Sequence, residues 1–165
     1  MEILEVASRI HDRFDVEVIG EADPDVEPHL RAAVSKGLLT WRGFLPNEEA
    51  LEHLSGALVG LSLIHPQPNH AGSLQTKVLE YLSRRVPVIS TDLPVTGAFV
   101  REHGVGITVC AGDVQAVVDA VERLAADEEE RRAMADRGFR LIDTELNWEI
   151  VGERFVAHLR QVGRR

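Results

Sequence analysis

Apolar residues along this chain follow two spacings, one typical of buried strands and one typical of amphipathic helices. Short segments of strand length, most of them rich in apolar residues, occupy residues 16–19, 39–42, 57–64, 87–90 and 106–109. Between them, apolar positions recur every three or four residues, as they do on one face of a helix. Strands that alternate with helices form β-α-β units and pair in parallel. The pattern therefore predicts an α/β fold with a parallel sheet flanked by helices.

The first periodic segment, residues 1–13, has the spacing of a helix, with apolar residues at Ile3, Val6 and Ile10. In a doubly wound sheet, a strand normally precedes the first helix and lies in the middle of the sheet. We therefore expect the chain to open partway through a β-α-β unit, so that its sheet lacks the first strand. The alternative is a sheet that is complete with fewer strands.

Polar residues that cap helix N-termini mark four further helix starts, at Asn47, Asp113, Asp127 and Asn147. The last of these helices carries an apolar stripe. It consists of Trp148, Val151, Phe155, Leu159 and Val162. Such a stripe needs a partner, because a helix buries its apolar face against another element.

The segment from His65 to Asp92 joins two predicted strands through a loop and a short helix. Ligands of open parallel sheets bind beyond the carboxyl ends of the strands. The loop at residues 65–76 is therefore expected at the ligand mouth. His65 and His70 lie in this loop, where either could contact a phosphate. The alternative for both is an ordinary solvent-exposed histidine.

Lys77 stands out on the helix that follows this loop. If the helix starts near Gln75, Lys77 lies in its first turn, where the helix dipole disfavours a cation. A lysine at that place suits an anionic ligand, because helix N-termini bind anions. Lys77 and Glu80 share one side of the helix, and Val78 and Leu82 share the other. The alternative is a solvated charged face without a ligand.

Two strings in this region, SLQTKVLEYLSRRVPVISTDLP and VREHGVGITVCAGDVQAVVDAVERLAADEEERRAM, resemble a known family. They are similar to the C-terminal donor-binding domain of family-four glycosyltransferases of the GT-B fold. The resemblance runs from about Phe14 to the last helix. It implies a Rossmann-like parallel sheet that binds a nucleoside-diphosphate sugar, and a retaining sugar transfer that needs neither a metal nor another cofactor.

The resemblance also implies roles for individual residues. Glu80 matches the family glutamate that binds the ribose hydroxyls. Lys77 and the backbone of Gly72, Ser73 and Leu74 match the groups that face the diphosphate. Gly72 itself stands where the family often has a second, sugar-binding glutamate, and Gln75 stands where the family motif has proline. The resemblance therefore says least about which sugar is bound.

Gly43, Phe44 and Leu45 match the segment that lines the nucleotide base in the family. For Phe44 the alternative is a plain core residue. No residue of this chain matches a catalytic group with certainty.

By the same resemblance, residues 1–146 form the nucleotide-sugar-binding domain, and residues 147–165 form a helix that packs back on it. The full enzyme would carry an N-terminal acceptor domain, without which we expect no turnover. Peripheral association of that enzyme with a membrane is also expected.

Composition narrows the possibilities further. A formal net charge of −9 argues against a nucleic-acid-binding role. Cys110 is the one cysteine, which excludes an internal disulfide and fits a reducing cytoplasm. No apolar run approaches the roughly 20 residues of a membrane span. The histidines show no zinc-binding spacing.

Two other functions share this architecture. A nucleotide-sugar epimerase half would bind the same donor but would use acid–base residues from two domains. A non-catalytic doubly wound module, such as a phosphoacceptor receiver domain, needs an acidic pocket at the strand ends. The predicted strand ends here offer a single carboxylate, Asp92, which makes the receiver alternative poor.

Overall fold

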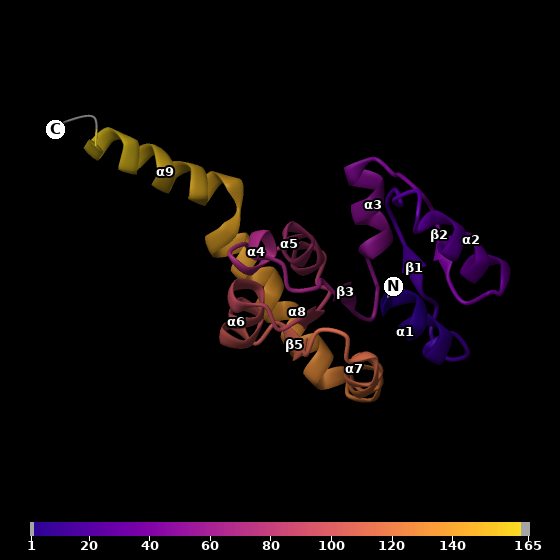
Figure 1. Cartoon of the computed structure of the whole chain (residues 1–165). Helices are drawn as coiled ribbons and strands as arrows, with labels where there is room; N and C mark the ends of the chain where they lie inside the picture. Colours follow the sequence, from indigo (N-terminus) through magenta and orange to yellow (C-terminus); the bar gives the residue numbers. More distant parts are fainter. Residues whose placement is uncertain (1, 163–165) are drawn as a thin grey trace.

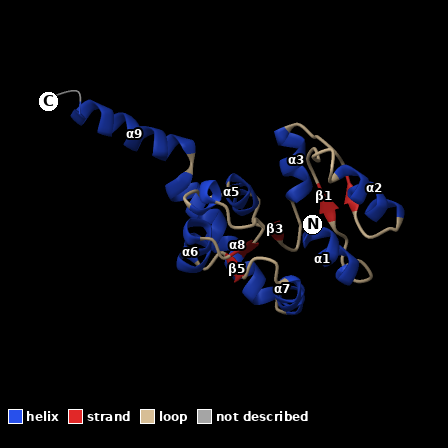
Figure 2. Cartoon of the chain, in the orientation of Figure 1, coloured by secondary structure: helices blue, strands red, loops and turns tan. Residues whose placement is uncertain are grey.

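The computed structural model describes residues 2–162, and it forms an α/β body from which the last helix projects (Figures 1 and 2). The elements in chain order are α1 (Glu2–Ile10), β1 (Glu17–Val18), α2 (Glu27–Ser35), β2 (Thr40–Trp41), α3 (Asn47–Leu54), β3 (Gly60–Ser62), α4 (Pro68–Ala71), α5 (Thr76–Ser83), β4 (Val88–Thr91), α6 (Pro94–His103), β5 (Gly106–Val109), α7 (Val114–Ala126), α8 (Glu128–Leu141), the π-helical turn η1 (Ile142–Leu146) and α9 (Trp148–Val162).

The strands pair in parallel, as the sequence predicts, but in two separate pieces. One piece pairs β1 with β2, and the other has the order β3-β4-β5. Each described pair is parallel, with Glu17 opposite Thr40, Leu61 opposite Ile89 and Ile89 opposite Ile107. The predicted α/β fold with helix-flanked parallel strands is confirmed. Every predicted apolar run overlaps a strand, although most strands are shorter than the runs, and β4 ends one residue beyond its run.

Strand β4 explains why the larger sheet needs helices on both faces. All four of its residues are buried. Val88 packs with α5 and α6 residues, whereas its neighbour Ile89 packs with α1 and α7 residues. Successive side chains of a strand point to opposite faces, so a strand covered on both sides reads as a continuous apolar run.

Three of the four predicted helix caps are confirmed. Asp113 and Asp127 accept hydrogen bonds from the amides of Ala116 and Glu130, at 2.9 and 2.8 Å. Asn147 Oδ1 accepts one from the Ile150 amide at 2.9 Å. The predicted cap at Asn47 is wrong. Pro46, in extended conformation, occupies the cap position, and Asn47 is already the first helical residue.

Helix α9 extends away from the body, as Figure 1 shows (yellow). Trp148, Phe155 and Leu159 are exposed along it. The expectation that residues 147–165 pack back on the domain is therefore not met within the described residues, because the apolar stripe finds no surface there. The Val162 side chain and residues 1 and 163–165 lie outside the description, and the domain boundary at residue 146 stays a prediction.

No helix within residues 2–162 combines the length and the hydropathy that a membrane crossing requires.

Candidate functional site

Helix α5 begins at Thr76, so Lys77 lies in its first turn as predicted. The helix is fixed by Val78 and Leu82, which are completely buried. On the side of the helix opposite Val78 and Leu82, Lys77 is exposed and Glu80 is half-buried. Gln75 occupies the cap position without a side-chain hydrogen bond. Among the described bonds, the Val78 amide donates to the Gln75 carbonyl at 3.0 Å, and the Thr76 and Lys77 amides have no partner. An anion at this end would find both those amides and the Lys77 ammonium.

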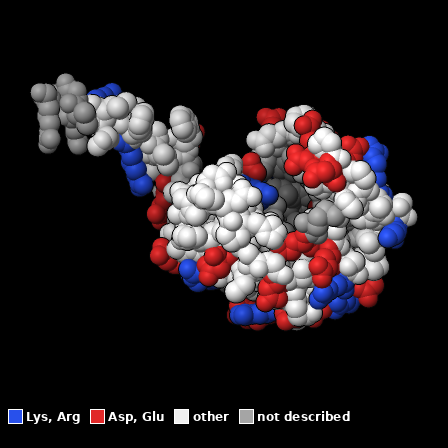
Figure 3. Space-filling view, viewed as in Figure 1, with Lys and Arg blue, Asp and Glu red and all other residues white. Residues whose placement is uncertain are grey.

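Lys77 lines a cavity of about 650 Å³ that lies between the two sheet pieces. The cavity walls come from residues 14–19, from residues 53–61 with Leu63, and from Ile3 and Ile10 of α1. Figure 3 shows the hollow on this side of the molecule, with acidic side chains gathered around much of its rim. Lys77 therefore lies beside a concave surface, as a ligand-binding lysine must.

Tyr81 also lines this cavity, and the sequence reasoning missed it. Its ring packs directly over Gly60, where a Cβ atom would overlap the ring. Its hydroxyl donates a hydrogen bond to the Leu61 carbonyl oxygen at 3.3 Å. Burial, with a smaller contribution from the Glu80 carboxylate, raises the pKa of Tyr81 to about 12. The sequence signal that could have indicated Tyr81 is an aromatic residue four positions after Lys77, which places it one helical turn further along.

The raised pKa of Tyr81 predicts a loss of stability in alkali. Between pH 10 and 12 the unfolded chain releases the phenol proton while the folded chain keeps it, so the free energy of unfolding falls as pH rises. Two pKa units correspond to roughly 2–3 kcal/mol. Since Tyr81 is the one tyrosine of the chain, tyrosinate absorbance reports its titration directly. Tyr81→Phe should abolish the phenol's part of this pH dependence; native titration near pH 10 would contradict the prediction.

Thr96, which is almost fully buried, holds the loop in front of α5. Its hydroxyl donates to the Ser73 carbonyl at 3.1 Å and accepts from the Gln75 amide at 3.4 Å. The hydroxyl thus ties α6 to the loop that the sequence predicts at the ligand mouth. Sequence reasoning did not single out Thr96, because the contact spans 23 residues.

The predicted diphosphate loop does not present all of its amides outward. The Gly72 and Ser73 amides both donate to the His70 carbonyl. Among the described contacts, the Leu74 amide has no partner. His65 is exposed and His70 is half-buried, with His70 Nδ1 at 3.4 Å from the His65 carbonyl.

The predicted base segment lies at the carboxyl end of β2. Gly43 has φ +66°, and its carbonyl accepts from the Gly20 amide at 2.7 Å. Phe44 is 69% exposed, so the alternative that it is a core residue is wrong. Leu45 is half-buried. Of the predicted site residues, Lys77 lines the cavity, whereas the others, Glu80 included, belong to neighbouring loops and faces. Their roles stay predictions.

The family model of the group 1 glycosyl transferases matches residues 2–127. The chain belongs to this family. The similarity to GT-B glycosyltransferases that the sequence indicates is thereby confirmed.

Related proteins agree with this assignment. This group 1 glycosyl transferase chain is 28% identical over 145 residues to an alpha-D-kanosaminyltransferase of Streptomyces kanamyceticus, a match that covers 87% of the chain and 36% of the relative. The chain thus corresponds to about a third of that relative's length.

Solved structures share the fold at low identity. Sucrose-phosphate synthase from Thermosynechococcus elongatus has a TM-score of 0.81 at 18% identity, over 99% of this chain and 42% of that one. Anabaena HepE, solved in complex with UDP, has a TM-score of 0.81 at 10% identity, and the match covers 97% of this chain and 44% of HepE. The C-terminal domain of the Francisella tularensis group 1 protein LpcC has a TM-score of 0.72 at 20% identity, and the match covers 88% of this chain and 78% of that domain. The fold is that of GT-B C-terminal domains.

Proposed function

We propose that this chain is the donor-binding domain of a retaining glycosyltransferase that takes its sugar from a nucleoside diphosphate. The observation that carries the proposal is Lys77 in the first turn of α5, at the edge of the cavity between β1 and β3. A cation beside uncapped helix amides suits a diphosphate, whose negative charge grows as it leaves the sugar. Electrostatic stabilisation of developing charge is usually a large part of catalysis.

The other predicted residues complete this proposal. Glu80 would bind the ribose hydroxyls, and the backbone at Gly72, Ser73 and Leu74 would adjoin the phosphates, with His65 or His70 as further phosphate contacts. Gly43, Phe44 and Leu45 would lie along the base. For the Gly72 and Ser73 amides to reach a phosphate, they must first leave the His70 carbonyl.

The comparisons support the class of ligand. HepE was solved with UDP, and the curated relative is named as a sugar transferase. They favour a transferase over an epimerase half or a receiver module. Binding of the acceptor and turnover would need a further, N-terminal domain, so a sugar-transfer assay with this chain alone is expected to show no appreciable activity. We further propose that the donor site uses no metal or cofactor, that the enzyme is cytoplasmic with peripheral membrane association, and that it binds no nucleic acid.

Lys77→Ala is expected to weaken binding of a nucleoside diphosphate roughly tenfold or more, because a charge-assisted contact to phosphate is lost. Calorimetry with UDP, GDP and ADP measures this. The matched control is Lys36→Ala, since Lys36 is the other lysine of the chain and lies at the far end of α2. That control should bind as the unchanged chain does.

Glu80→Ala extends the same test to the ribose, with Glu129→Ala on the exposed start of α8 as its control. A loss of affinity for nucleoside diphosphates but not for inorganic pyrophosphate would assign Glu80 to the ribose. If neither Lys77→Ala nor Glu80→Ala changes the affinity, the site lies elsewhere.

A further inference from the structure

Thr96, in the first turn of α6, contacts the backbone on both sides of Leu74. Its hydroxyl donates to the Ser73 carbonyl oxygen at 3.1 Å and accepts from the Gln75 amide at 3.4 Å, and the residue is 1% exposed. The Leu74 side chain packs against the core cluster that contains Val78 of α5. The segment of residues 73–75 is therefore held at two backbone groups and at its central side chain.

This fixation sets the direction of the Leu74 amide. The Ser73–Leu74 peptide bond is trans, so its N–H group points opposite to its carbonyl group. Because Thr96 of α6 holds the Ser73 carbonyl, the Leu74 N–H group points away from Thr96. Among the described bonds, the Leu74 amide has no partner. Thr96 thus leaves this amide turned outward, where a ligand can accept from it.

The two preceding amides of the loop are already occupied. The Gly72 and Ser73 amides both donate to the His70 carbonyl oxygen, just past the single turn of α4. They reach a phosphate only after that turn has opened. The Leu74 amide needs no such rearrangement, because its direction is set by the contacts of Thr96.

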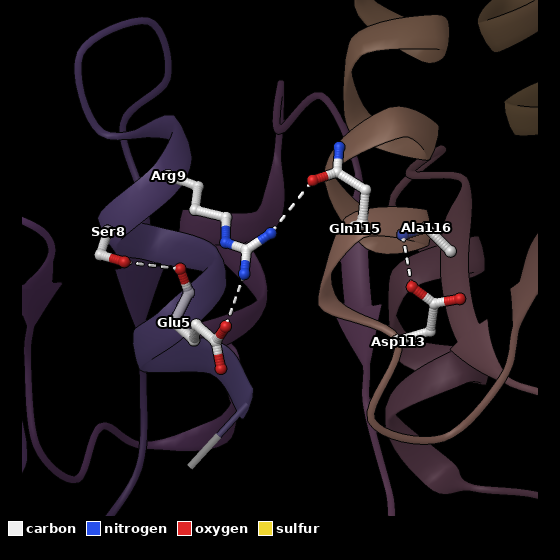
Figure 4. A network of polar contacts seen from close by, with 6 residues as sticks. All are labelled: Glu5, Ser8, Arg9, Asp113, Gln115 and Ala116. Carbon is white, nitrogen blue, oxygen red and sulfur yellow. Dashed lines mark hydrogen bonds and ion pairs between the residues drawn. The ribbon is translucent and has the colours of Figure 1, made fainter.

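Helix α5 begins two residues after Leu74 and presents further amides. Among the described bonds, the Thr76 and Lys77 amides of its first turn have no partner. The start of α7 shows the contrast, because there Asp113 accepts from the Ala116 amide at 2.9 Å (Figure 4). Leu74 adds its amide to those at the start of α5, next to the residue that carries a cation. Backbone amides at a helix start and a nearby ammonium group suit phosphate oxygens.

The second link of Thr96 depends on the residue at position 75. Gln75 stands where the motif that the sequence resembles has proline, and proline has no amide hydrogen to donate. Gln75 is extended, with φ −71° and ψ 125°, directly before α5. Its amide therefore gives Thr96 a contact that the proline of the motif could not make.

We propose that Thr96 is a positioning residue for the donor diphosphate: its buried hydroxyl holds residues 73–75 so that the Leu74 amide faces the anion that Lys77 binds. This inference rests on the proposed function, because it places the diphosphate at the start of α5. Thr96 acts through the loop and does not itself contact the ligand. A donor that is already oriented saves the entropy that ordering the loop on binding would cost.

Thr96→Val tests the proposal, because valine has nearly the shape of threonine without the hydroxyl. Calorimetry should show affinities for UDP and for inorganic pyrophosphate that are both lower by about fivefold or more, since two backbone groups lose their partner. Both ligands should be affected alike, because they share the phosphates. Thr96→Ser keeps the hydroxyl and should bind both ligands as the unchanged chain does.

The matched control is Thr91→Val. It removes a second buried threonine hydroxyl, which accepts from the Ile64 amide at 3.1 Å and has no bond to residues 73–75. Thr91→Val should leave both affinities unchanged. Equal losses in Thr96→Val and Thr91→Val would assign the effect to lower stability and would overturn the positioning role.

Nuclear magnetic resonance follows the Leu74 amide directly. Pyrophosphate should shift the Leu74 amide proton resonance in the unchanged chain and in Thr96→Ser, and should shift it less in Thr96→Val. A purely structural role of Thr96 would lower stability in urea without altering this response. The unchanged chain alone keeps the proposal testable if Thr96→Val does not fold. A Leu74 resonance that stays in place at saturating pyrophosphate would contradict the proposal.

The outcomes separate this inference from the proposed function. If Lys77→Ala weakens binding and Thr96→Val does not, the donor site stands and the positioning role is wrong. A chain that binds neither nucleoside diphosphates nor pyrophosphate would remove the proposed function and the positioning role together.

Discussion

Gly106→Ala is expected to destabilise the chain by at least about 3 kcal/mol, because β5 approaches β4 too closely at this residue for any side chain. A Cβ atom on Gly106 would overlap the Val88 carbonyl oxygen, with the Val88 carbonyl carbon at 2.8 Å and its nitrogen at 2.9 Å. These are backbone atoms in the centre of the sheet, so they cannot turn aside as the end of a long side chain can.

Urea unfolding followed by circular dichroism measures this effect as a lower midpoint with an unchanged slope. The matched control is Gly152→Ala, where the nearest atom lies 3.9 Å away in Trp148. Alanine favours a helix over glycine, so the control should be neutral or slightly stabilising. A Gly106→Ala chain as stable as the control would mean that β4 and β5 do not pair as described.

Leu82→Ala is expected to cost about 2–5 kcal/mol, since it empties a fully buried site beneath α5. Leu82 fills the space over Gly138 of α8, where a Cβ atom would come within 2.5 Å of Leu82 Cδ2. The same residue anchors the helix that presents Lys77. Nucleotide affinity should therefore fall together with stability, which separates Leu82→Ala from a purely local change.

The combination with Gly138→Ala makes this prediction specific. Alone, Gly138→Ala overpacks against Leu82 and should destabilise the chain by about 1–3 kcal/mol. In the double variant the added methyl group enters the space that Leu82 has left. The loss of stability in the double variant should therefore be smaller than the sum of the two single losses by about 1 kcal/mol or more. Strictly additive losses in urea unfolding would show that the two residues are not in contact.

Much of the local structure follows from short-range patterns. The buried run at residues 87–90 predicts β4, because a strand covered on both faces needs no alternation. Asp113 and Asp127 predict helix starts because their side chains reach amides only three residues away. The predicted cap at Asn47 fails for the same local reason, since the cap position falls one residue earlier, on Pro46, and Asn47 is already helical. Lys77 at the start of α5 is likewise readable from the sequence.

By itself, the sequence determined the parallel α/β class, the order of its elements and the placement of a lone lysine at a helix start. Only the tertiary structure decided that the sheet is divided at β1 and β3, that Tyr81 spans Gly60 to reach Leu61, and that Thr96 holds the loop before α5. Those contacts join residues 20 or more positions apart. Periodicity records which face of an element is apolar, but not which distant element that face will meet.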